Sequence, residues 1–494
     1  MEVDGPSFCL TKATNGKCWQ SLSITIQIVT IMILKFVDRG SELETLNSLF
    51  SKKSAALVLL YGRRRVGKTR LVQEFLRDKR SLYFYVPNAE EKTILAEFSR
   101  VVESEFFEGF RFADFGSFME YLVKRSGDGT IVAIDEFQRL TNIDGALSLL
   151  QKYWDEKLSN VKCFLIFSGS SIGAIRRVAL SGDAPLYGRR TATLKMEPLK
   201  YLDLFNWFGE YPAEELVKIY GSFGGTPAYL EHVDENLSVE ENIVEKILSK
   251  RSPLYDEPEM LLMKEIRAPQ RYMDILTVIA LGKSTLSEIA DATGLIRENA
   301  TTYLKTLEIL DLIERVTPIT EHEAKRGLYK IRDPFFSFWF RFVRPNKRQI
   351  ELELERNLWE GVREEFNGYL GHVFEDICRE VLVEMARKSL LPIRAEKIGK
   401  WWWKETEIDL LGLESKDGKA LAVEVKWTDL DYHEAKKLLL ELAAKAQKIR
   451  NVKEATIGLM AKKIEGKEKI RSEGFMALDL QDIRHGNTTE SARL

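Results

Sequence analysis

Residues 62–69 combine residue types and a spacing that suit binding of nucleotide phosphates. They read Gly-Arg-Arg-Arg-Val-Gly-Lys-Thr and lie between an apolar run at 57–60 and an amphipathic segment at 69–77. In such a loop the backbone N–H groups converge on phosphate oxygens, and the positive end of the next helix adds to them. A chance match in a Gly- and Lys-rich turn is the alternative, which the strand–loop–helix context disfavours. The predicted nucleotide-binding residues are Gly62, Arg63, Arg64, Arg65, Val66, Gly67, Lys68, Thr69 and Arg70.

Four residues are predicted to carry out hydrolysis of the bound nucleotide. Lys68 would neutralise phosphate charge, and the hydroxyl of Thr69 would bind Mg²⁺. Residues 130–136 form an apolar run that ends in Asp135 and Glu136. Asp135 could bind Mg²⁺ through water, and Glu136 could polarise the attacking water. The alternative is a strand that simply ends in solvated acids.

A loop farther along the chain offers two arginines for the same reaction. Arg189 or Arg190 could act as an arginine finger that counters charge on the transferred phosphoryl group, in the same chain or across an oligomer. A solvated loop arginine is the equally weighted alternative.

A second group of residues with catalytic chemistry lies near the C-terminus. Glu375 falls on an amphipathic segment, Asp409 on an apolar strand, and Glu424 and Lys426 on the next strand, two residues apart and so on one face. Paired antiparallel strands would bring Asp409 and Glu424 together as Mg²⁺ ligands, with Glu375 above them. Lys426 would orient a nucleophile or neutralise developing charge. Alternating charges on a solvated hairpin are the alternative, although the apolar neighbours argue for a buried sheet.

The elements that must position these groups predict an α/β chain of several parts. We expect an N-terminal extension at 1–34, a nucleotide-binding α/β core within 35–260, a winged helix-turn-helix at 268–335, an α/β domain with the acidic cluster at 336–480 and a tail at 481–494. The winged helix has a capping box at Thr285 and Glu288, and its third helix exposes Arg297 and Lys305. It could contact DNA or serve only for packing.

Composition limits the class of protein. The 494 residues carry a net charge of −2, so any nucleic-acid contact must come from local basic patches. The four scattered cysteines indicate a reducing, cytoplasmic setting. The apolar run at 21–34 is too short to cross a bilayer, so no membrane association is expected. Either Met32 is the true start of the protein, or this run is an ordinary N-terminal strand.

The ordered motifs of the N-terminal half resemble those of the archaeal P-loop ATPase family, which is related to AAA+ and STAND ATPases. They are Phe36-Val37-Asp38-Arg39, GRRRVGKTRL, AIDEFQRL, FSGSSIG, PLYGRRT and Gly224-Gly225-Thr226-Pro227. The resemblance implies that residues 35–260 form a P-loop ATPase core followed by a helical lid, with ATP as the nucleotide. It further implies that residues 36–39 lie near the base and that Pro227 reads the nucleotide state from the lid. It also implies Ser168 as a sensor of the γ-phosphate, for which a strand-end turn is the alternative.

The C-terminal acids and lysine resemble the PD-(D/E)xK nuclease family, although Ile408 stands where the proline of the family name would be. Nearby, Trp401-Trp402-Trp403 could stack on bases or lie in the core. A helix at 434–450 carries basic residues that could contact phosphates or simply face solvent, namely Lys436, Lys437, Lys445, Lys448 and Arg450.

Together these features predict a Mg²⁺-dependent ATPase coupled to DNA binding or cleavage, with RNA as an open alternative and a homo-oligomer as a further expectation. Two other functions stay open. One is a regulatory ATPase whose C-terminal domain binds nucleic acid or a protein without cleavage. The other is a chaperone-like or scaffold ATPase that acts on protein.

Overall fold

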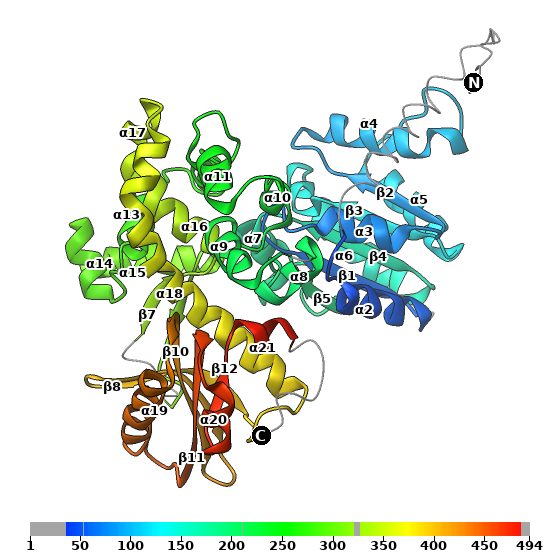
Figure 1. Cartoon of the computed structure of the whole chain (residues 1–494). Helices are drawn as coiled ribbons and strands as arrows, with labels where there is room; N and C mark the ends of the chain where they lie inside the picture. The colour runs from blue at the N-terminus through cyan, green and yellow to red at the C-terminus, as the bar shows by residue number, and fades with distance from the viewer. Residues whose placement is uncertain (1–35, 53, 210, 321–326, 486–494) are drawn as a thin grey trace, which may run out of the picture.

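The computed structural model describes residues 36–52, 54–209, 211–320 and 327–485 (Figure 1). The proposed extension at 1–34, with Met32 and the apolar run at 21–34, lies outside these ranges. Ordered structure continues past residue 480 as helix α21 (Leu480–His485), in which Ile483 is buried, so the predicted tail begins too early. None of the helices in the described ranges combines the length and apolar character that crossing a bilayer requires.

The N-terminal part is a five-stranded parallel sheet in the order β2-β3-β4-β1-β5. The inserted strand β4 separates β1, which leads into the phosphate loop, from β3, which ends in the acid pair. The inner strands of this sheet are apolar on both faces, as parallel strands between two helical layers must be. The strands are β1 (Ala56–Tyr61), β2 (Ser81–Tyr85), β3 (Ile131–Asp135), β4 (Phe164–Gly169) and β5 (Ala192–Lys195).

Two helical layers cover this sheet. Helices α2 (Gly40–Ser51) and α3 (Lys68–Leu76) contribute Leu46, Leu71 and Phe75 to the core on one face. The other face is covered by α4 (Glu91–Val102), α5 (Phe115–Gly127) and α6 (Ala146–Glu156), with η2 (Phe137–Asn142) and η4 (Arg176–Leu180) beside them. Short turns η1 (Glu103–Glu105) and η3 (Leu158–Asn160) and helix α7 (Ile172–Ile175) complete this part. Cys163 is a buried core residue here, as expected.

A helical segment follows β5 and leads to three helices and a hairpin at the predicted positions. The lid contains η5 (Tyr201–Asp203), α8 (Leu204–Phe208), α9 (Ala213–Phe223), α10 (Pro227–Leu230), α11 (Val239–Ile243), η6 (Val244–Leu248) and α12 (Glu257–Glu265). The next elements are α13 (Gln270–Ala280), α14 (Leu286–Thr293), α15 (Arg297–Ile309), β6 (Ile313–Val316) and β7 (Leu328–Ile331). The capping box of Thr285 and Glu288 is formed, and Gly294 ends α14 in the left-handed conformation.

The C-terminal part is a mixed sheet in the order β12-β11-β10-β9-β8. β8, β9 and β10 are antiparallel neighbours, whereas β10 and β11 are parallel and joined by a crossover helix, α19. The elements are α16 (Pro334–Phe338), η7 (Trp339–Val343), η8 (Arg344–Asn346), α17 (Lys347–Glu351), α18 (Glu355–Arg387), β8 (Lys397–Trp403), β9 (Thr406–Glu414), β10 (Lys419–Leu430), α19 (Tyr432–Ala446), β11 (Glu454–Ile464), α20 (Lys467–Ser472), β12 (Met476–Leu478) and α21.

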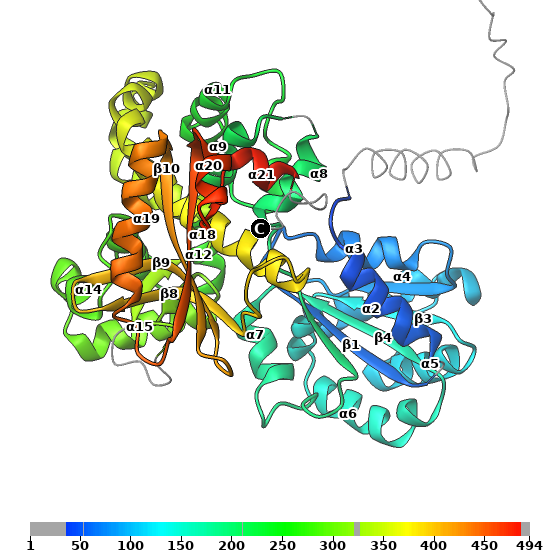
Figure 2. The ribbon, with the colours of Figure 1, turned by 60° about the horizontal axis from the view of Figure 1, so that its bottom comes forward.

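One apolar core runs through the middle of the molecule. It joins the helices between β5 and α13, the segment from α13 to β7, α16, α18 and one face of the C-terminal sheet. Figures 1 and 2 show α9 and α18 between the two sheets. The hydroxyl of Tyr369 on α18 lies 2.9 Å from the carbonyl oxygens of both Gly221 on α9 and Pro334 on α16. The predicted boundaries near 268 and 336 therefore cross a continuous core.

Candidate functional site

The phosphate loop joins the end of β1 to the start of α3, and its glycines are needed for its shape. A Cβ atom at Gly62 would lie 2.3 Å from the carbonyl oxygen of Met196, and Gly67 has a φ of 93°. Only glycine tolerates both the close approach and the left-handed backbone at little cost. The loop therefore packs closely against Met196, the residue that follows β5.

Lys68 is held by carbonyl groups of its own loop. Its ammonium donates hydrogen bonds to Gly62 O at 2.9 Å and to Arg63 O at 2.7 Å. Burial lowers the pKa of Lys68 to about 8, although the charges of Glu136 and Asp135 oppose this effect. A phosphate group would replace these carbonyl contacts and favour the charged ammonium.

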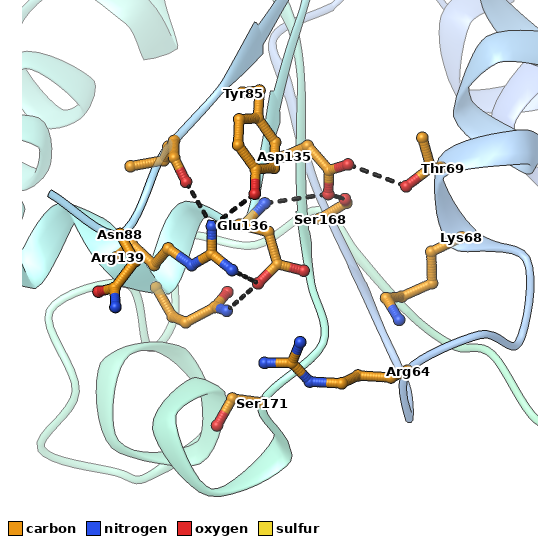
Figure 3. Close-up of polar contacts among 12 residues, drawn as sticks. Arg64, Lys68, Thr69, Tyr85, Asn88, Asp135, Glu136, Arg139, Ser168 and Ser171 are labelled. Carbon is orange, nitrogen blue, oxygen red and sulfur yellow. Dashed lines mark hydrogen bonds and ion pairs between the residues drawn. The ribbon is translucent and has the colours of Figure 1, made fainter. Parts of the chain in front are cut away.

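Asp135 lies at the centre of a hydrogen-bonded group at the ends of the strands (Figure 3). Thr69 donates to its Oδ2 at 2.9 Å, and Ser168 donates to its Oδ1. The hydroxyl of Tyr83 also donates to Oδ2, at 2.5 Å; burial and the charge of Asp135 raise the pKa of this phenol far above its usual range. The adjacent hydroxyl and carboxylate oxygens of Thr69 and Asp135 are hard donors that fit Mg²⁺. Sequence reasoning missed Tyr83, whose only signal was its place two residues before the end of β2.

Glu136 directs its carboxylate toward residues of its own turn. Its φ is 55°, an unusual backbone for a non-glycine residue, which commonly marks functional sites. Gln138 donates to its Oε2 at 2.7 Å, and Arg139 lies 3.4 Å from the same oxygen (Figure 3). Arg139 is itself held by Tyr85 Oη at 2.8 Å and Val86 O at 2.9 Å. The predicted general base is therefore paired with a cation in this state.

A cavity of about 490 Å³ adjoins the loop and is shared with the lid. It brings the motif residues Phe36 and Val37 together with Pro227. Acidic lid residues also reach it. The lining residues are Phe36, Val37, Arg39, Arg64, Arg65, Val66, Gly67, Lys68, Thr69, Arg70, Glu136, Ser170, Trp207, Pro227, Ala228, Glu231, Glu257, Leu261 and Lys264.

The three consecutive arginines of the loop extend toward other elements. Arg63 forms a buried ion pair with Asp333, with Nη1 2.9 Å from Oδ2 and the side chains 8% and 2% exposed. Arg65 pairs with Glu257 at 3.0 Å, and Arg64 lies 3.9 Å from Glu265. Asp333 caps α16 by accepting the N–H of Phe335, whereas the two glutamates mark the ends of α12. The phosphate loop thus contacts both the lid and the helix that leads into the C-terminal part.

The structure contradicts the prediction that Arg189 serves the nucleotide site of its own chain. Arg189 precedes β5 and therefore lies at the sheet edge opposite the phosphate loop, because the loop follows the end of a parallel strand. Its guanidinium binds both carboxylate oxygens of Asp155, at 2.7 and 2.8 Å. Arg190 donates to Thr193 at 3.0 Å beside it. A role across an oligomer stays a prediction.

The predicted C-terminal acids lie where β9 and β10 separate. The β9–β10 ladder ends at the pair Leu410 and Val423, and Asp409 then accepts the N–H of Val425 at 2.9 Å. In the β8–β9 ladder Gly399 pairs with Leu411 but Trp401 pairs with Ile408, so Lys400 faces both Asp409 and Leu410. This extra residue in β9 is a β-bulge, a feature that re-aims side chains beside active sites.

Glu424 and Lys426 face α19, whereas Glu375 comes from α18 on the other side of the sheet. Val423 and Val425 belong to the core under α18, so strand alternation turns Glu424 toward α19. Lys426 binds its Oε1 at 2.8 Å, and Lys445 of α19 binds its Oε2 at 3.2 Å. Lys445, which was predicted as part of a candidate phosphate-contacting face, is thus paired with Glu424 in this structure.

The charges of this group shift the pKa values of the two other acids in opposite directions. Burial and the charge of Glu424 raise the pKa of Asp409 to about 6. Burial alone would raise the pKa of Glu375. A hydrogen bond from His372 and the charge of Lys400, 3.3 Å away, instead lower this pKa to about 2. Among the described residues, no three His, Cys, Asp or Glu side chains gather closely enough to hold a metal ion. Sequence reasoning missed Lys400 and His372.

The parallel sheet and the loop-bound lysine define a P-loop ATPase domain. Residues 36–233 match the model of an ATPase domain predominantly from Archaea, and residues 339–438 match a second model described as archaeal and bacterial proteins of unknown function. An uncharacterized protein of Methanocaldococcus jannaschii is 36% identical over 454 residues, which are 91% of this chain and 100% of that protein. The chain belongs to this archaeal ATPase family.

Shorter and weaker similarities were also found. An uncharacterized ATP-binding protein of M. jannaschii is 50% identical over 48 residues, 10% of this chain and 81% of that protein. The Walker-type ATPase of Pyrococcus abyssi is 20% identical with a TM-score of 0.47, covering 62% of this chain and 96% of that one. The ORC2 protein of Aeropyrum pernix is 17% identical with a TM-score of 0.43, covering 67% and 96%.

Proposed function

We propose that the chain is a Mg²⁺-dependent ATPase whose nucleotide state controls how its C-terminal part engages nucleic acid. The observation that carries this proposal is the set of contacts from Arg63, Arg64 and Arg65. The residues that would surround the phosphates also bind the lid and the N-terminal end of α16. A change at the phosphates therefore has a direct path to the core that contains α18.

The residues of the loop suggest how binding and hydrolysis proceed. Mg²⁺ held by Thr69, and through water by Asp135, would offset the negative charge of the phosphates. Lys68 would exchange the carbonyl oxygens of Gly62 and Arg63 for phosphate oxygens, which frees the backbone of Arg63. Glu136 would leave Arg139 and Gln138 to orient the attacking water.

The C-terminal part supports a nuclease-like role. It has a helix, three antiparallel strands, a crossover helix and a parallel strand, in that order. The proposal is supported by the proximity of Asp409 on β9 to Glu424 on β10, where these two strands separate, with Lys426 bound to Glu424. Burial and the negative charge of Glu424 raise the pKa of Asp409, and a divalent cation bound here would favour its charged form. We propose Asp409 and Glu424 as Mg²⁺ ligands and Lys426 as the group that stabilises phosphate charge. Glu375 would orient Lys400 rather than bind the cation.

A second function is favoured by the ion pairs in the same place. Glu424 already binds two lysines, and Glu375 binds Lys400. A domain that binds nucleic acid without cleaving it would have such neutralised acids. The ATPase would then be a regulatory switch.

One set of assays separates these functions. Purified protein is incubated with branched, single-stranded and double-stranded DNA and Mg²⁺, with and without ATP. We expect cleavage that disappears in Asp409→Ala, and ATP turnover that disappears in Lys68→Ala while the fold is kept. Nucleic-acid-stimulated ATP turnover without any cleavage would select the regulatory switch, and full turnover by Lys68→Ala would contradict the ATPase proposal.

A further inference from the structure

A cavity of about 540 Å³ lies at the edge of the C-terminal sheet, away from the nucleotide site. It is bounded by the edge strand β8, the turn between β9 and β10, the residues after α19, and Ile319 and Thr320, which follow β6. The N–H of Ile319 donates to Lys400 O at 3.0 Å, so the helix-turn-helix segment is joined to the strand that forms one wall. A ligand here would touch both parts.

The cavity concentrates positive charge in a chain whose net charge is −2. Four exposed cations line it, against one acid, Glu414, whose carboxylate accepts the N–H of Arg394 at 2.8 Å. The size of the cavity is in the range of small-molecule sites. The cations are Lys397, Lys419, Lys448 and Arg450. This charge suits a phosphate-bearing ligand.

Two tryptophans give the cavity an aromatic wall. Trp401 is 4% exposed and packs in the core under α19, so it forms a fixed base. Trp403 is 40% exposed, and the guanidinium of Arg450 lies 5.3 Å from its ring centroid. An exposed indole beside cations is the combination on which nucleic-acid bases stack while their phosphates are neutralised.

The cavity also leads toward the C-terminal acids. Lys448, which lines it, follows Lys445 by three residues in a continuing turn, and Lys445 binds Glu424. Residues three apart on a helical turn share one face. A strand held at Trp403 would therefore pass along α19 toward Glu424 and Asp409.

We propose that this cavity binds a nucleotide unit, an aromatic base with its phosphate, stacked on Trp403 and neutralised by Arg450 and Lys448. The source of the unit is a single-stranded nucleic acid or a free nucleotide. This inference rests on the proposed engagement of nucleic acid by the C-terminal part and names its ligand class, but it requires neither cleavage nor ATP turnover.

The test measures binding by the full chain in EDTA without ATP. Fluorescence anisotropy follows a labelled oligothymidylate, with unlabelled dTMP and the matching duplex as competitors. Trp403→Ala should weaken binding about tenfold, because stacking of one base is lost, whereas Trp403→Phe should retain most of the affinity. Arg450→Gln should weaken it several-fold and lower the salt dependence by about one phosphate contact. Lys437→Gln, on α19 and outside the cavity, is the control and should not change the affinity.

The outcomes are distinct from those of the ATPase assays. If dTMP competes with the oligonucleotide and Trp403→Ala abolishes this competition, the ligand is a free nucleotide. If the oligonucleotide binds and dTMP does not compete, the ligand is a single strand. Both results support the site. The proposal would be overturned if the wild-type chain bound neither the oligonucleotide nor dTMP. It would also be overturned if Trp403→Ala and Arg450→Gln both bound with the affinity of the wild type. Unchanged ATP turnover in Trp403→Ala shows that the variant is folded. The binding assay contains no ATP, so it does not depend on ATP turnover. Weaker binding by Arg450→Gln therefore supports the site even if the wild-type chain does not hydrolyse ATP.

Discussion

Lys68 and Asp409 each carry a titratable group that burial has moved toward neutral pH. In both cases the charged form is poorly solvated and lacks its expected partner, a phosphate for Lys68 and a cation for Asp409. Such shifts are common where a protein is poised to bind an ion. They give two predictions at the scale of single residues.

ATP affinity should fall as the pH rises above 8. The pKa of Lys68 is about 8 in the free chain, and bound phosphates favour its charged form, so binding takes up a proton at higher pH. The dissociation constant should rise by up to roughly tenfold per pH unit between about pH 8 and 10. Isothermal titration calorimetry with MgATP measures this, and Lys68→Arg, which stays charged, should remove the dependence. A flat wild-type profile would contradict the assignment.

Removal of the Asp409 charge should stabilise the C-terminal part at neutral pH. The pKa is raised to about 6 in the folded chain, so folding favours the protonated form, and stability increases as the pH falls through 6 toward 4. The full effect is at most about 3 kcal/mol. Asp409→Asn should gain about 1–2 kcal/mol at pH 7.5 and nothing near pH 4, as measured by urea unfolding. Asp417→Asn, in an exposed turn, should show no such gain at either pH; an equal gain would indicate a general charge effect.

At the scale of elements, the ion pair of Arg63 and Asp333 joins the phosphate loop to α16. Both side chains are buried, and Asp333 also caps the helix. Loss of one partner would leave a buried charge unpaired. The pair therefore links the site to the core that holds α18.

Asp333→Ala should lower the free energy of unfolding by about 3–5 kcal/mol. Arg65→Ala breaks a pair whose arginine is 40% exposed and whose glutamate is 9% exposed, so its cost should be smaller than that of Asp333→Ala. Chemical unfolding followed by circular dichroism compares the two. The double variant Arg63→Ala/Asp333→Ala should lose less than the sum of the single losses. Strict additivity would show that the two side chains do not interact.

At the scale of the whole molecule, the close contact of α9 and α18 decides whether the parts move together. A Cβ atom at Gly221 of α9 would lie 2.8 Å from Cδ2 of the buried Leu370 on α18. Gly361, also on α18, has open space where its Cβ would be. The same substitution should therefore have opposite effects at the two positions.

Gly361→Ala should stabilise the chain by about 0.5–1 kcal/mol, because alanine favours the helix. Gly221→Ala should lose about 1 kcal/mol or more despite the same gain, because the added methyl group overpacks the contact. Thermal unfolding measures both variants, and hydrogen exchange on α18 with and without ATP shows whether Gly221→Ala also weakens the coupling. Equal stabilisation by Gly361→Ala and Gly221→Ala would show that the contact between α9 and α18 accommodates the added methyl group without cost.

The nucleotide site was predictable from the sequence because it is local. One loop supplies Lys68 and Thr69, and buried strands that end in Asp135 or Ser168 must place those residues at one edge of a parallel sheet. The helix-turn-helix elements were equally local, since capping at Thr285 and Gly294 sets their ends.

Tertiary structure alone decided contacts between distant segments and the direction of side chains. The pairing of Arg63 with Asp333 joins positions 270 residues apart, and no periodicity reveals it. Arg189 lies at the sheet edge opposite the phosphate loop, because it precedes β5 and β5 runs parallel to β1. The bulge at Asp409 and the turning of Glu424 toward α19 depend on strand register, because one extra residue reverses which face a side chain meets. The sequence by itself determined the residues of the phosphate site, whereas packing of the sheets and α18 determined how they connect to the rest of the molecule.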